Sequence, residues 1–161
     1  MRAVGQDDRP TGDQPRIMVV DDVETNRGIL RRLVARCGYE VVEADSGYSA
    51  IELVTRQPPN LILLDMSMPG FSGLETLAVL RQRYDAAALP IIMVTASHGA
   101  EVARECLSAG ANDYVTKPVQ WPVLQARIST QLGMHTAHMK LMRDKTRLEA
   151  RAGGPALKAV G

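Results

Sequence analysis

Carboxylate, hydroxyl and ammonium side chains follow short apolar runs at intervals along the 161-residue chain. The residues that follow the first, third, fourth and fifth runs are Asp21 with Asp22, Asp65, Thr95, and Thr116 with Lys117. If the runs are parallel strands, these groups share the edge of the sheet at which ligands bind in open α/β folds. The sequence therefore predicts one polar site assembled from distant parts of the chain.

The residue types at this edge favour phosphoryl chemistry. Crowded carboxylates repel each other and raise at least one of their pKa values unless a cation joins them. An all-oxygen site suits a hard divalent ion, and Mg²⁺ is the natural choice because it usually keeps waters and binds phosphate oxygens. The lysine and a hydroxyl can hold further phosphate oxygens. One of the carboxylates can then act as a nucleophile and form an aspartyl phosphate.

An alternation of strands and helices between residues 16 and 117 positions these groups. Short β-branched apolar runs alternate there with amphipathic segments, which predicts five successive strand–helix units. Such alternation is typical of the α/β class, with a parallel sheet covered by helices. We place the strands at Ile17–Val20, Glu40–Ala44, Leu61–Leu64, Ile91–Val94 and Asp113–Val115.

Local signals mark the helices between these strands. The first helix carries apolar residues at helical spacing, and Gly38 sits where a C-terminal cap needs positive φ. A second helix is expected over Ser46–Arg56. Ser72 and Glu75 have the spacing of a capping box at the start of the third, and the fourth is expected over residues 99–109.

A helical pattern continues from Trp121 to Arg151 and is expected to overrun the domain. Its apolar positions come close to the seam spacing of a coiled coil, so we expect a homodimer through Leu132, Met139 and Met142. His135 and His138 are interpreted as seam or polar positions, because no third donor stands at metal spacing. The expected divisions are a tail over residues 1–14, a domain over 15–132, a helical extension over 133–151 and a tail over 152–161.

Composition excludes several classes of protein. The apolar runs are far shorter than the ~20 residues that span a bilayer, and no signal peptide core opens the chain, so we expect a cytoplasmic protein that does not enter membranes. A net charge of +1 gives no footprint for direct nucleic acid binding. Cys37 and Cys106 lie in apolar helical patterns and are interpreted as small core residues.

Four motifs in order resemble the response-regulator receiver family of two-component systems, of the chemotaxis-regulator type. They are Val20-Asp21-Asp22, Leu64-Asp65-Met66-Ser67-Met68-Pro69-Gly70 with Gly73, Val94-Thr95-Ala96, and Thr116-Lys117-Pro118. The resemblance covers about residues 16–132. It implies a flavodoxin-like, doubly wound sheet of strand order 2-1-3-4-5, and a cis bond before Pro118.

The same resemblance implies a signalling switch rather than an enzyme with a separate substrate. A sensor histidine kinase or a histidine phosphotransfer protein would phosphorylate Asp65. Mg²⁺ would be held by Asp22, Asp65 and the backbone carbonyl of Ser67, with Asp21 assisting. Lys117 and Thr95 would contact the phosphoryl group, and Thr95 with Tyr114 would form the switch.

Other interpretations are weighed against this one. A magnesium-dependent phosphatase usually needs a second aspartate two residues after the nucleophile, where this chain has Ser67. A flavin or dinucleotide module needs a glycine-rich turn after the first strand, where this chain has Asp21 and Asp22. A pseudo-receiver scaffold without chemistry stays open, as does the N-terminal regulatory part of a longer protein.

Overall fold

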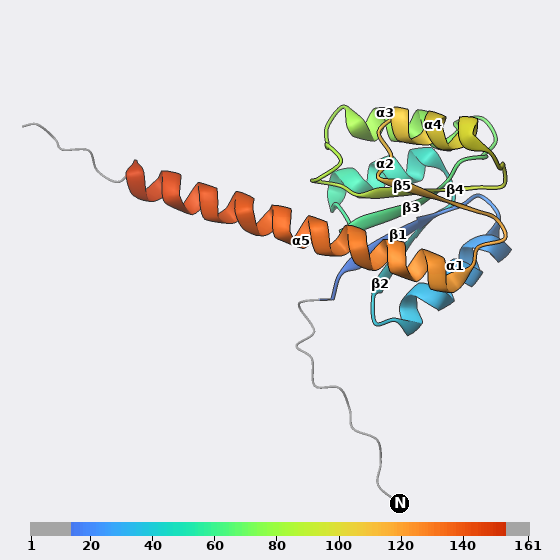
Figure 1. The fold of residues 1–161 in the computed structure, drawn as a ribbon, viewed down its shortest axis with the longest axis horizontal. Coiled ribbons are helices and arrows are strands. Elements are labelled where there is room, and N and C mark those ends of the chain that lie inside the picture. Colours follow the sequence, from blue (N-terminus) through green and yellow to red (C-terminus); the bar gives the residue numbers. More distant parts are fainter. Residues whose placement is uncertain (1–13, 154–161) are drawn as a thin grey trace, which may run out of the picture.

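Five parallel strands form the single sheet of the computed structural model, which describes residues 14–153 (Figure 1). Their order is β2-β1-β3-β4-β5, which confirms the predicted order 2-1-3-4-5. The second strand has the predicted bounds, and the other four are each one residue longer than predicted. The strands are β1 (Arg16–Val20), β2 (Glu40–Ala44), β3 (Leu61–Asp65), β4 (Ile91–Thr95) and β5 (Asp113–Thr116).

Each strand is followed by a helix, and the predicted caps are present. Ser46 and Ser72 each complete a capping box, the latter with Glu75 as predicted. Gly38 adopts a φ of 84°, the left-handed conformation expected of it after the first helix. The helices are α1 (Glu24–Arg36), α2 (Gly47–Arg56), α3 (Gly73–Arg81), α4 (Ala100–Ser108) and α5 (Trp121–Ala152).

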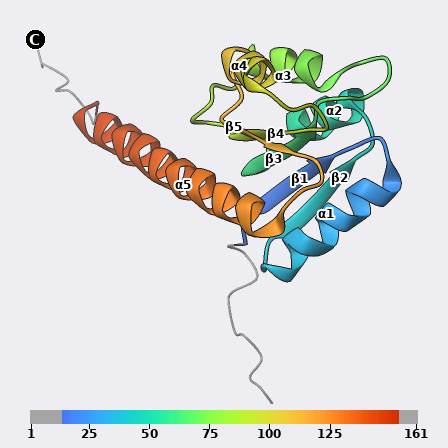
Figure 2. The same cartoon turned by 45° about the vertical axis from the view of Figure 1, so that its right-hand side comes forward.

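Two layers of helices cover the two faces of the sheet (Figures 1 and 2). Alternate residues of the central strands enter opposite cores, so that Ile62 packs with α2, α3 and α4, whereas Leu61 and Leu63 pack with α1 and α5. All five residues of β3 and of β4 are buried. Burial on both faces explains why these strands are continuous apolar runs in the sequence.

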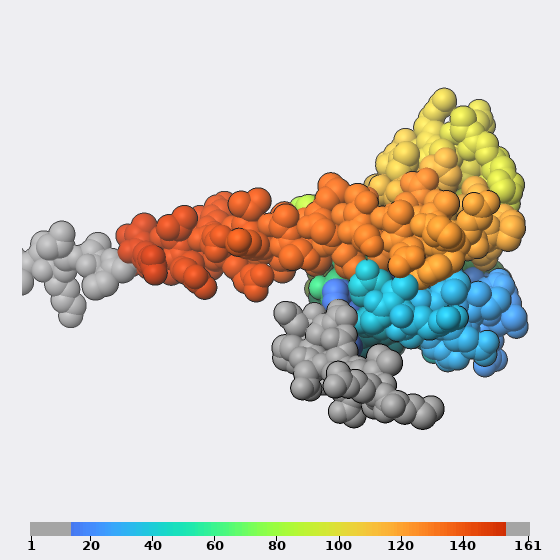
Figure 3. All heavy atoms as spheres, turned by 60° about the horizontal axis from the view of Figure 1, so that its bottom comes forward, coloured from blue at the N-terminus to red at the C-terminus, as the bar shows by residue number. Residues whose placement is uncertain are grey.

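The last helix is much longer than the face of the sheet that it covers. Leu124, Ile128, Leu132 and His135 are buried on its inner side, whereas residues 139–153 are exposed (Figure 3). His135 Nδ1 lies 3.1 Å from the backbone carbonyl oxygen of Ala87, between α3 and β4. The expected self-association through Leu132 is therefore wrong, because this side chain is 7% exposed within its own domain. The packed part of α5 continues through His135.

Other expectations have simpler outcomes. Cys106 is buried as expected, whereas Cys37 is half-buried at the end of α1. The two expected tails lie outside the described residues apart from Gln14, Ala152 and Gly153. Within residues 14–153, no helix combines the length and hydropathy needed to cross a bilayer.

Candidate functional site

The carboxyl ends of the strands bring the predicted polar residues to one edge of the sheet. Asp21 directly follows β1, while Asp65 and Thr95 are the last residues of β3 and β4. Lys117 directly follows β5. Because β3 lies between β1 and β4, Asp65 occupies the middle of this edge.

Three carboxylates gather at this edge, as the sequence predicted. One oxygen from each of Asp21, Asp22 and Asp65 lies within 4.8 Å of the other two. Asp21 and Asp65 are 1% and 4% exposed, and Asp22 is more open to solvent. Burial is the main cause that raises the pKa of Asp65, and the charge of Asp21 raises it further. The cluster is thus short of positive charge.

Lys117 supplies part of that charge. Its Nζ lies 3.3 Å from Asp21 Oδ2 and 3.2 Å from Asp65 Oδ1, so the ammonium bridges the two buried carboxylates. Burial disfavours the charged lysine, but the charges of Asp65 and Asp21 outweigh it and raise the pKa of Lys117. The ammonium is therefore held protonated beside the two acids. The Lys117–Pro118 bond is cis, as the resemblance implied.

The hydrogen bonds leave some carboxylate oxygens occupied and others free. Asp21 Oδ1 accepts from the Val23 amide at 2.9 Å, and its Oδ2 accepts from Lys117. Asp65 Oδ1 accepts from Lys117 Nζ and, at 3.4 Å, from the Ser67 amide. Asp65 Oδ2 and both oxygens of Asp22 have no partner among residues 14–153. The unengaged oxygens belong to the predicted phosphoacceptor and the predicted metal ligand.

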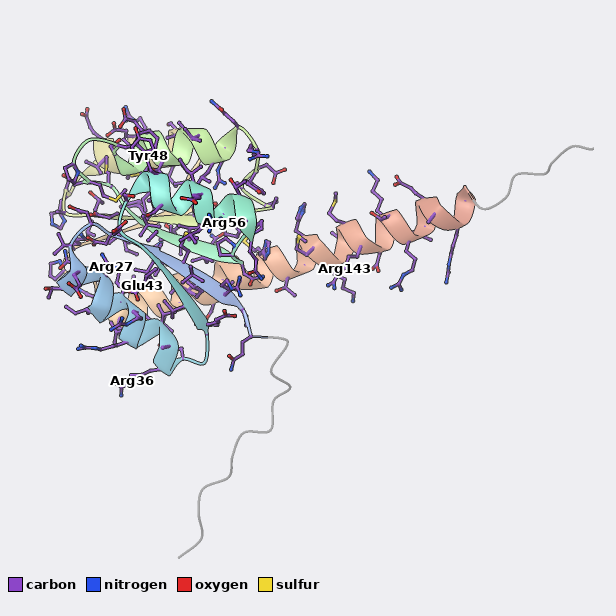
Figure 4. All side chains as sticks on the ribbon, turned by 180° about the vertical axis from the view of Figure 1, so that it is seen from behind. Arg27, Arg36, Glu43, Tyr48, Arg56 and Arg143 are labelled. Atoms are coloured by element: carbon purple, nitrogen blue, oxygen red, sulfur yellow. The ribbon has the colours of Figure 1, made fainter. Side chains whose placement is uncertain are left out.

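Close packing holds the loop between β3 and α3 against this cluster. Gly73 Cα faces the backbone of Asp65 so closely that an added Cβ would overlap the Asp65 carbonyl oxygen and lie 2.8 Å from Met66 Cα. The Gly73 amide donates to the Met66 carbonyl oxygen at 3.0 Å. Within the loop, the ring of Phe71 stacks on Tyr48 of α2 with centroids 4.7 Å apart. Tyr48 is labelled on α2 in Figure 4. The two ends of the loop that carries Ser67 are thereby held together, and its later part is held against α2.

The two predicted switch residues lie on the side of the sheet that α4 covers. Thr95 is fully buried, and its Oγ1 accepts from the Ser97 amide at 3.0 Å. The Thr95 carbonyl oxygen accepts from the Lys117 amide at 2.7 Å, which links the ends of β4 and β5. The half-buried Tyr114 packs against the core formed with α2, α3 and α4. The hydroxyl of Thr95 and the ring of Tyr114 thus belong to neighbouring strands.

Comparison with known proteins decides the family. Residues 17–129 match the family described as "Response regulator receiver domain". The chain belongs to the response regulator receiver domain family. The fold and the family resemblance stated from the sequence are therefore confirmed, and this receiver domain is a module of two-component signalling.

Named relatives agree with the family. The receiver domain is 38% identical over 125 residues to "Uncharacterized transcriptional regulatory protein YrkP" of Bacillus subtilis (strain 168), which covers 78% of this chain and 52% of that protein. A CheY-like response regulator receiver domain protein from Methanospirillum hungatei JF-1 is 27% identical, with a TM-score of 0.71 over 78% of this chain and 98% of the other. A putative two-component system response regulator/GGDEF domain protein is 30% identical, with a TM-score of 0.73. That match covers 76% of this chain and 51% of the other.

One expectation loses its support in this comparison. The net charge was interpreted as evidence against direct nucleic acid binding, yet the curated relative is named a transcriptional regulatory protein. The chain spans about half the length of that relative. The charge of this receiver domain therefore does not decide whether the whole protein acts on nucleic acid.

The donor set of the receiver domain fits a magnesium ion. All candidate side-chain ligands are carboxylate oxygens, the type of donor that Mg²⁺ prefers. Asp22 combines closeness to the other two acids with a carboxylate that no residue between 14 and 153 engages. A bare group of three acids with one lysine is electrostatically unbalanced, which a divalent cation would correct.

Two further residues that shape the site did not stand out in the sequence. Arg27 of α1 donates from Nη1 to the Asp21 carbonyl oxygen at 2.8 Å. Its position six residues after Asp21 gave a weak signal, because arginine is common on solvated helix faces. In the sequence, Gly73 was recognised only as part of a motif. A glycine is needed there because the position packs against the Asp65 backbone, and only the folded structure shows that contact.

Proposed function

We propose that this receiver domain takes a phosphoryl group from a histidine kinase, or from a histidine phosphotransfer protein, onto Asp65 and then changes a partner-binding face. The observation that carries the proposal is that Asp65 Oδ2 has no partner in the part of the chain that the structure describes. This oxygen belongs to a buried carboxylate at the centre of the ligand-binding edge whose other oxygen is held by Lys117. The neighbouring acid Asp21 has both oxygens engaged, which favours Asp65 as the nucleophile.

The proposed phosphoryl transfer uses this arrangement of side chains. Asp65 Oδ2 attacks the phosphorus of a phosphohistidine, and an oxygen–phosphorus bond forms as the nitrogen–phosphorus bond to the histidine breaks. Lys117 already lies beside Asp65 and would contact the oxygens of the incoming group. Its charge stabilises the negative charge on those oxygens. The histidine leaves with the electron pair of the broken bond.

The metal site belongs to the same proposal. Asp22, Asp65 and the backbone carbonyl of Ser67 would hold Mg²⁺, and Asp21 would assist. When bound, the ion would neutralise charge on the phosphoryl oxygens and on the acids around them. Asp22 would provide the ligand least committed to other contacts, while Asp21 stays bound to Lys117 and the Val23 amide.

The proposed switch couples Thr95 to Tyr114. Before phosphorylation, the Thr95 hydroxyl accepts from the Ser97 amide at 3.0 Å. A phosphoryl group on Asp65 would offer this hydroxyl a new acceptor, and the space left on the α4 side would admit the ring of Tyr114. The local change at Asp65 would then reach the surface near α4 and β5.

Magnesium dependence tests the proposal. We expect the protein to take up one phosphoryl group from acetyl phosphate with Mg²⁺ and almost none when the metal is chelated. Asp22→Ala should weaken Mg²⁺ affinity by about 10-fold or more and slow uptake at limiting Mg²⁺, because it removes a direct ligand from a site with few. Intact-mass spectrometry over time measures the uptake, and calorimetry measures the affinity.

The matched control for Asp22→Ala is Asp45→Ala, which removes an exposed acid whose one hydrogen-bond partner among residues 14–153 is Ser49. The control should behave as the wild-type protein does. Uptake that is equally fast with and without Mg²⁺, or equally fast in Asp22→Ala, would contradict the metal assignment. A wild-type protein that takes up nothing from any phosphodonor would favour the pseudo-receiver.

The distal part of α5 suggests a further role in self-association. Its exposed apolar residues need cover that the domain does not give, and we propose a second copy of the chain. Leu141 and Leu148 are 69% and 64% exposed, and Met139 and Met142 are 41% and 48% exposed. Each apolar side chain buried in a dimer contributes roughly 1.5–3 kcal/mol, offset by the entropy of association. The dimer is therefore expected to be weak.

Replacing both leucines tests this role in the full chain. Leu141→Ser with Leu148→Ser should shift the monomer–dimer equilibrium towards the monomer, as measured by sedimentation at several concentrations. Arg143→Ser, an exposed change on the same segment, is the control (Figure 4). A wild-type protein that stays monomeric up to the highest concentration would leave α5 without this role. The alternative is that α5 leads into an output domain of a longer protein. The chain spans about half the length of the Bacillus subtilis relative and of the GGDEF domain protein, which agrees with that alternative.

A further inference from the structure

Arg27 connects the turn that contains Asp21 and Asp22 to β2, an edge strand of the sheet. Its Nη1 donates to the Asp21 carbonyl oxygen at 2.8 Å, and its Nε donates to Glu43 Oε1 of β2 at 3.3 Å. The side chain is only 16% exposed. Arg27 and Glu43 lie side by side between α1 and β2 in Figure 4. One guanidinium thus spans a loop carbonyl and a strand carboxylate.

The carbonyl that Arg27 holds belongs to the peptide that joins Asp21 to Asp22. Because a peptide unit is planar, fixing its oxygen also fixes the amide and Cα of Asp22. On the other side of Asp22, the Val23 amide donates to Asp21 Oδ1 at 2.9 Å. The Asp21 amide is itself tied to the Ala44 carbonyl oxygen at 3.2 Å. The backbone around Asp22 is therefore held at several points, while its carboxylate has no partner within the described residues.

We propose that Arg27 is a positioning residue for metal binding, and that it holds the turn so that the Asp22 carboxylate faces Asp65. The inference rests on the proposed function, since Asp22 matters here as a metal ligand. Glu43 orients the guanidinium, and partners that orient a ligand in this way typically contribute 10- to 100-fold to metal affinity. A planar fork suits this task because it can serve two acceptors at once.

Arg31 distinguishes position from charge. It lies one turn further along α1, and its Nη1 donates to Glu43 Oε2 at 3.1 Å. It has the same charge and the same carboxylate partner as Arg27, but its side chain is 46% exposed and does not contact Asp21. If net charge near the acids set the metal affinity, the loss of either arginine would matter. If the position of the turn sets it, only the loss of Arg27 would matter.

Calorimetric titration with Mg²⁺ compares the wild-type chain with its Arg27→Met, Arg27→Lys and Arg31→Met variants. Methionine keeps most of the apolar stem and removes the donors. We expect Arg27→Met to raise the Mg²⁺ dissociation constant about 10-fold and Arg31→Met to leave it unchanged. Arg27→Lys should lie between them, because an ammonium replaces the fork. At saturating Mg²⁺, phosphoryl uptake by Arg27→Met should return close to the wild-type rate.

A second measurement needs no metal. In metal-free protein, hydrogen exchange of the Val23 amide should be faster in Arg27→Met than in Arg31→Met, because the turn has lost its brace. An unchanged Mg²⁺ affinity in Arg27→Met, or an equal loss in Arg31→Met, would overturn the inference. If Arg27→Met does not fold, a wild-type dissociation constant in Arg27→Lys overturns it. A wild-type protein that binds no Mg²⁺ would instead refute the proposed function, and with it this inference.

Discussion

Replacing Asp65 by asparagine should abolish phosphoryl uptake, because the amide keeps the shape of the side chain but removes the anionic nucleophile. The effect should be the largest of any single substitution in the site, because the nearby carboxylate of Asp22 is proposed to hold the metal and not to attack the phosphorus. Asp21 cannot replace it easily, because both of its oxygens are already bound. Intact-mass spectrometry after incubation with acetyl phosphate and Mg²⁺ measures the loss.

The same samples report on the switch. The ring signals of Tyr114 should change when the wild-type protein is phosphorylated and stay unchanged in Asp65→Asn. Asp45→Asn makes the same chemical change at an exposed site and should leave uptake intact. Undiminished uptake in Asp65→Asn would move the phosphoacceptor elsewhere. A Tyr114 signal that is the same in both states of the wild-type protein would remove the switch from the proposal.

Gly73→Ala should both destabilise the fold and impair the site. The new Cβ would overlap the Asp65 carbonyl oxygen and lie 2.8 Å from Met66 Cα, and both are backbone atoms that cannot rotate away. Overpacking of this kind typically costs about 1–3 kcal/mol of the free energy of unfolding. Because the displaced backbone carries Asp65, phosphoryl uptake should slow as well. Urea unfolding and the uptake assay measure the two effects.

Gly133→Ala is the matched control for this change. Gly133 lies within α5, and apart from its chain neighbours and the adjoining helix backbone no heavy atom of residues 14–153 lies within 4 Å of an added Cβ. Alanine should therefore stabilise the protein by about 0.5–1 kcal/mol, since glycine is unfavourable inside a helix. The same substitution thus has opposite expected signs at the two positions. Equal stability and uptake in Gly73→Ala and the wild-type protein would show that the loop relaxes without cost.

The sequence predicted the site better than it predicted the contacts around the site. A parallel sheet places the residue after each apolar run at one edge, which was enough to bring Asp21, Asp65 and Lys117 together. It could not show that Lys117 bridges the two acids or which oxygen of Asp65 stays free. Those facts depend on side-chain rotamers and on loop packing, which sequence spacing does not contain.

Long-range contacts made by arginines were equally hidden. Arg81 at the end of α3 donates to the carbonyl oxygens of Gly110 and Leu89, 29 and 8 residues away. Periodicity also could not show where α5 leaves the domain. Leu132 and Met139 fit the same helical stripe, yet the first is buried and the second is 41% exposed, because the sheet ends between them.

The part of α5 beyond the domain would enlarge small movements of the part that is packed on the sheet. His135 is the last buried residue of α5 and contacts Ala87, so any tilt of the segment beyond it would turn about that contact. At about 1.5 Å per residue, residues 136–152 form an arm of about 25 Å. A tilt of about 10° at this contact would swing the tip of that arm through about 4 Å. Spin labels at Arg56 and Arg147 would register such a swing as a change in their separation. A shift too small to disturb the core could thus become a displacement as wide as a side chain where the arm ends.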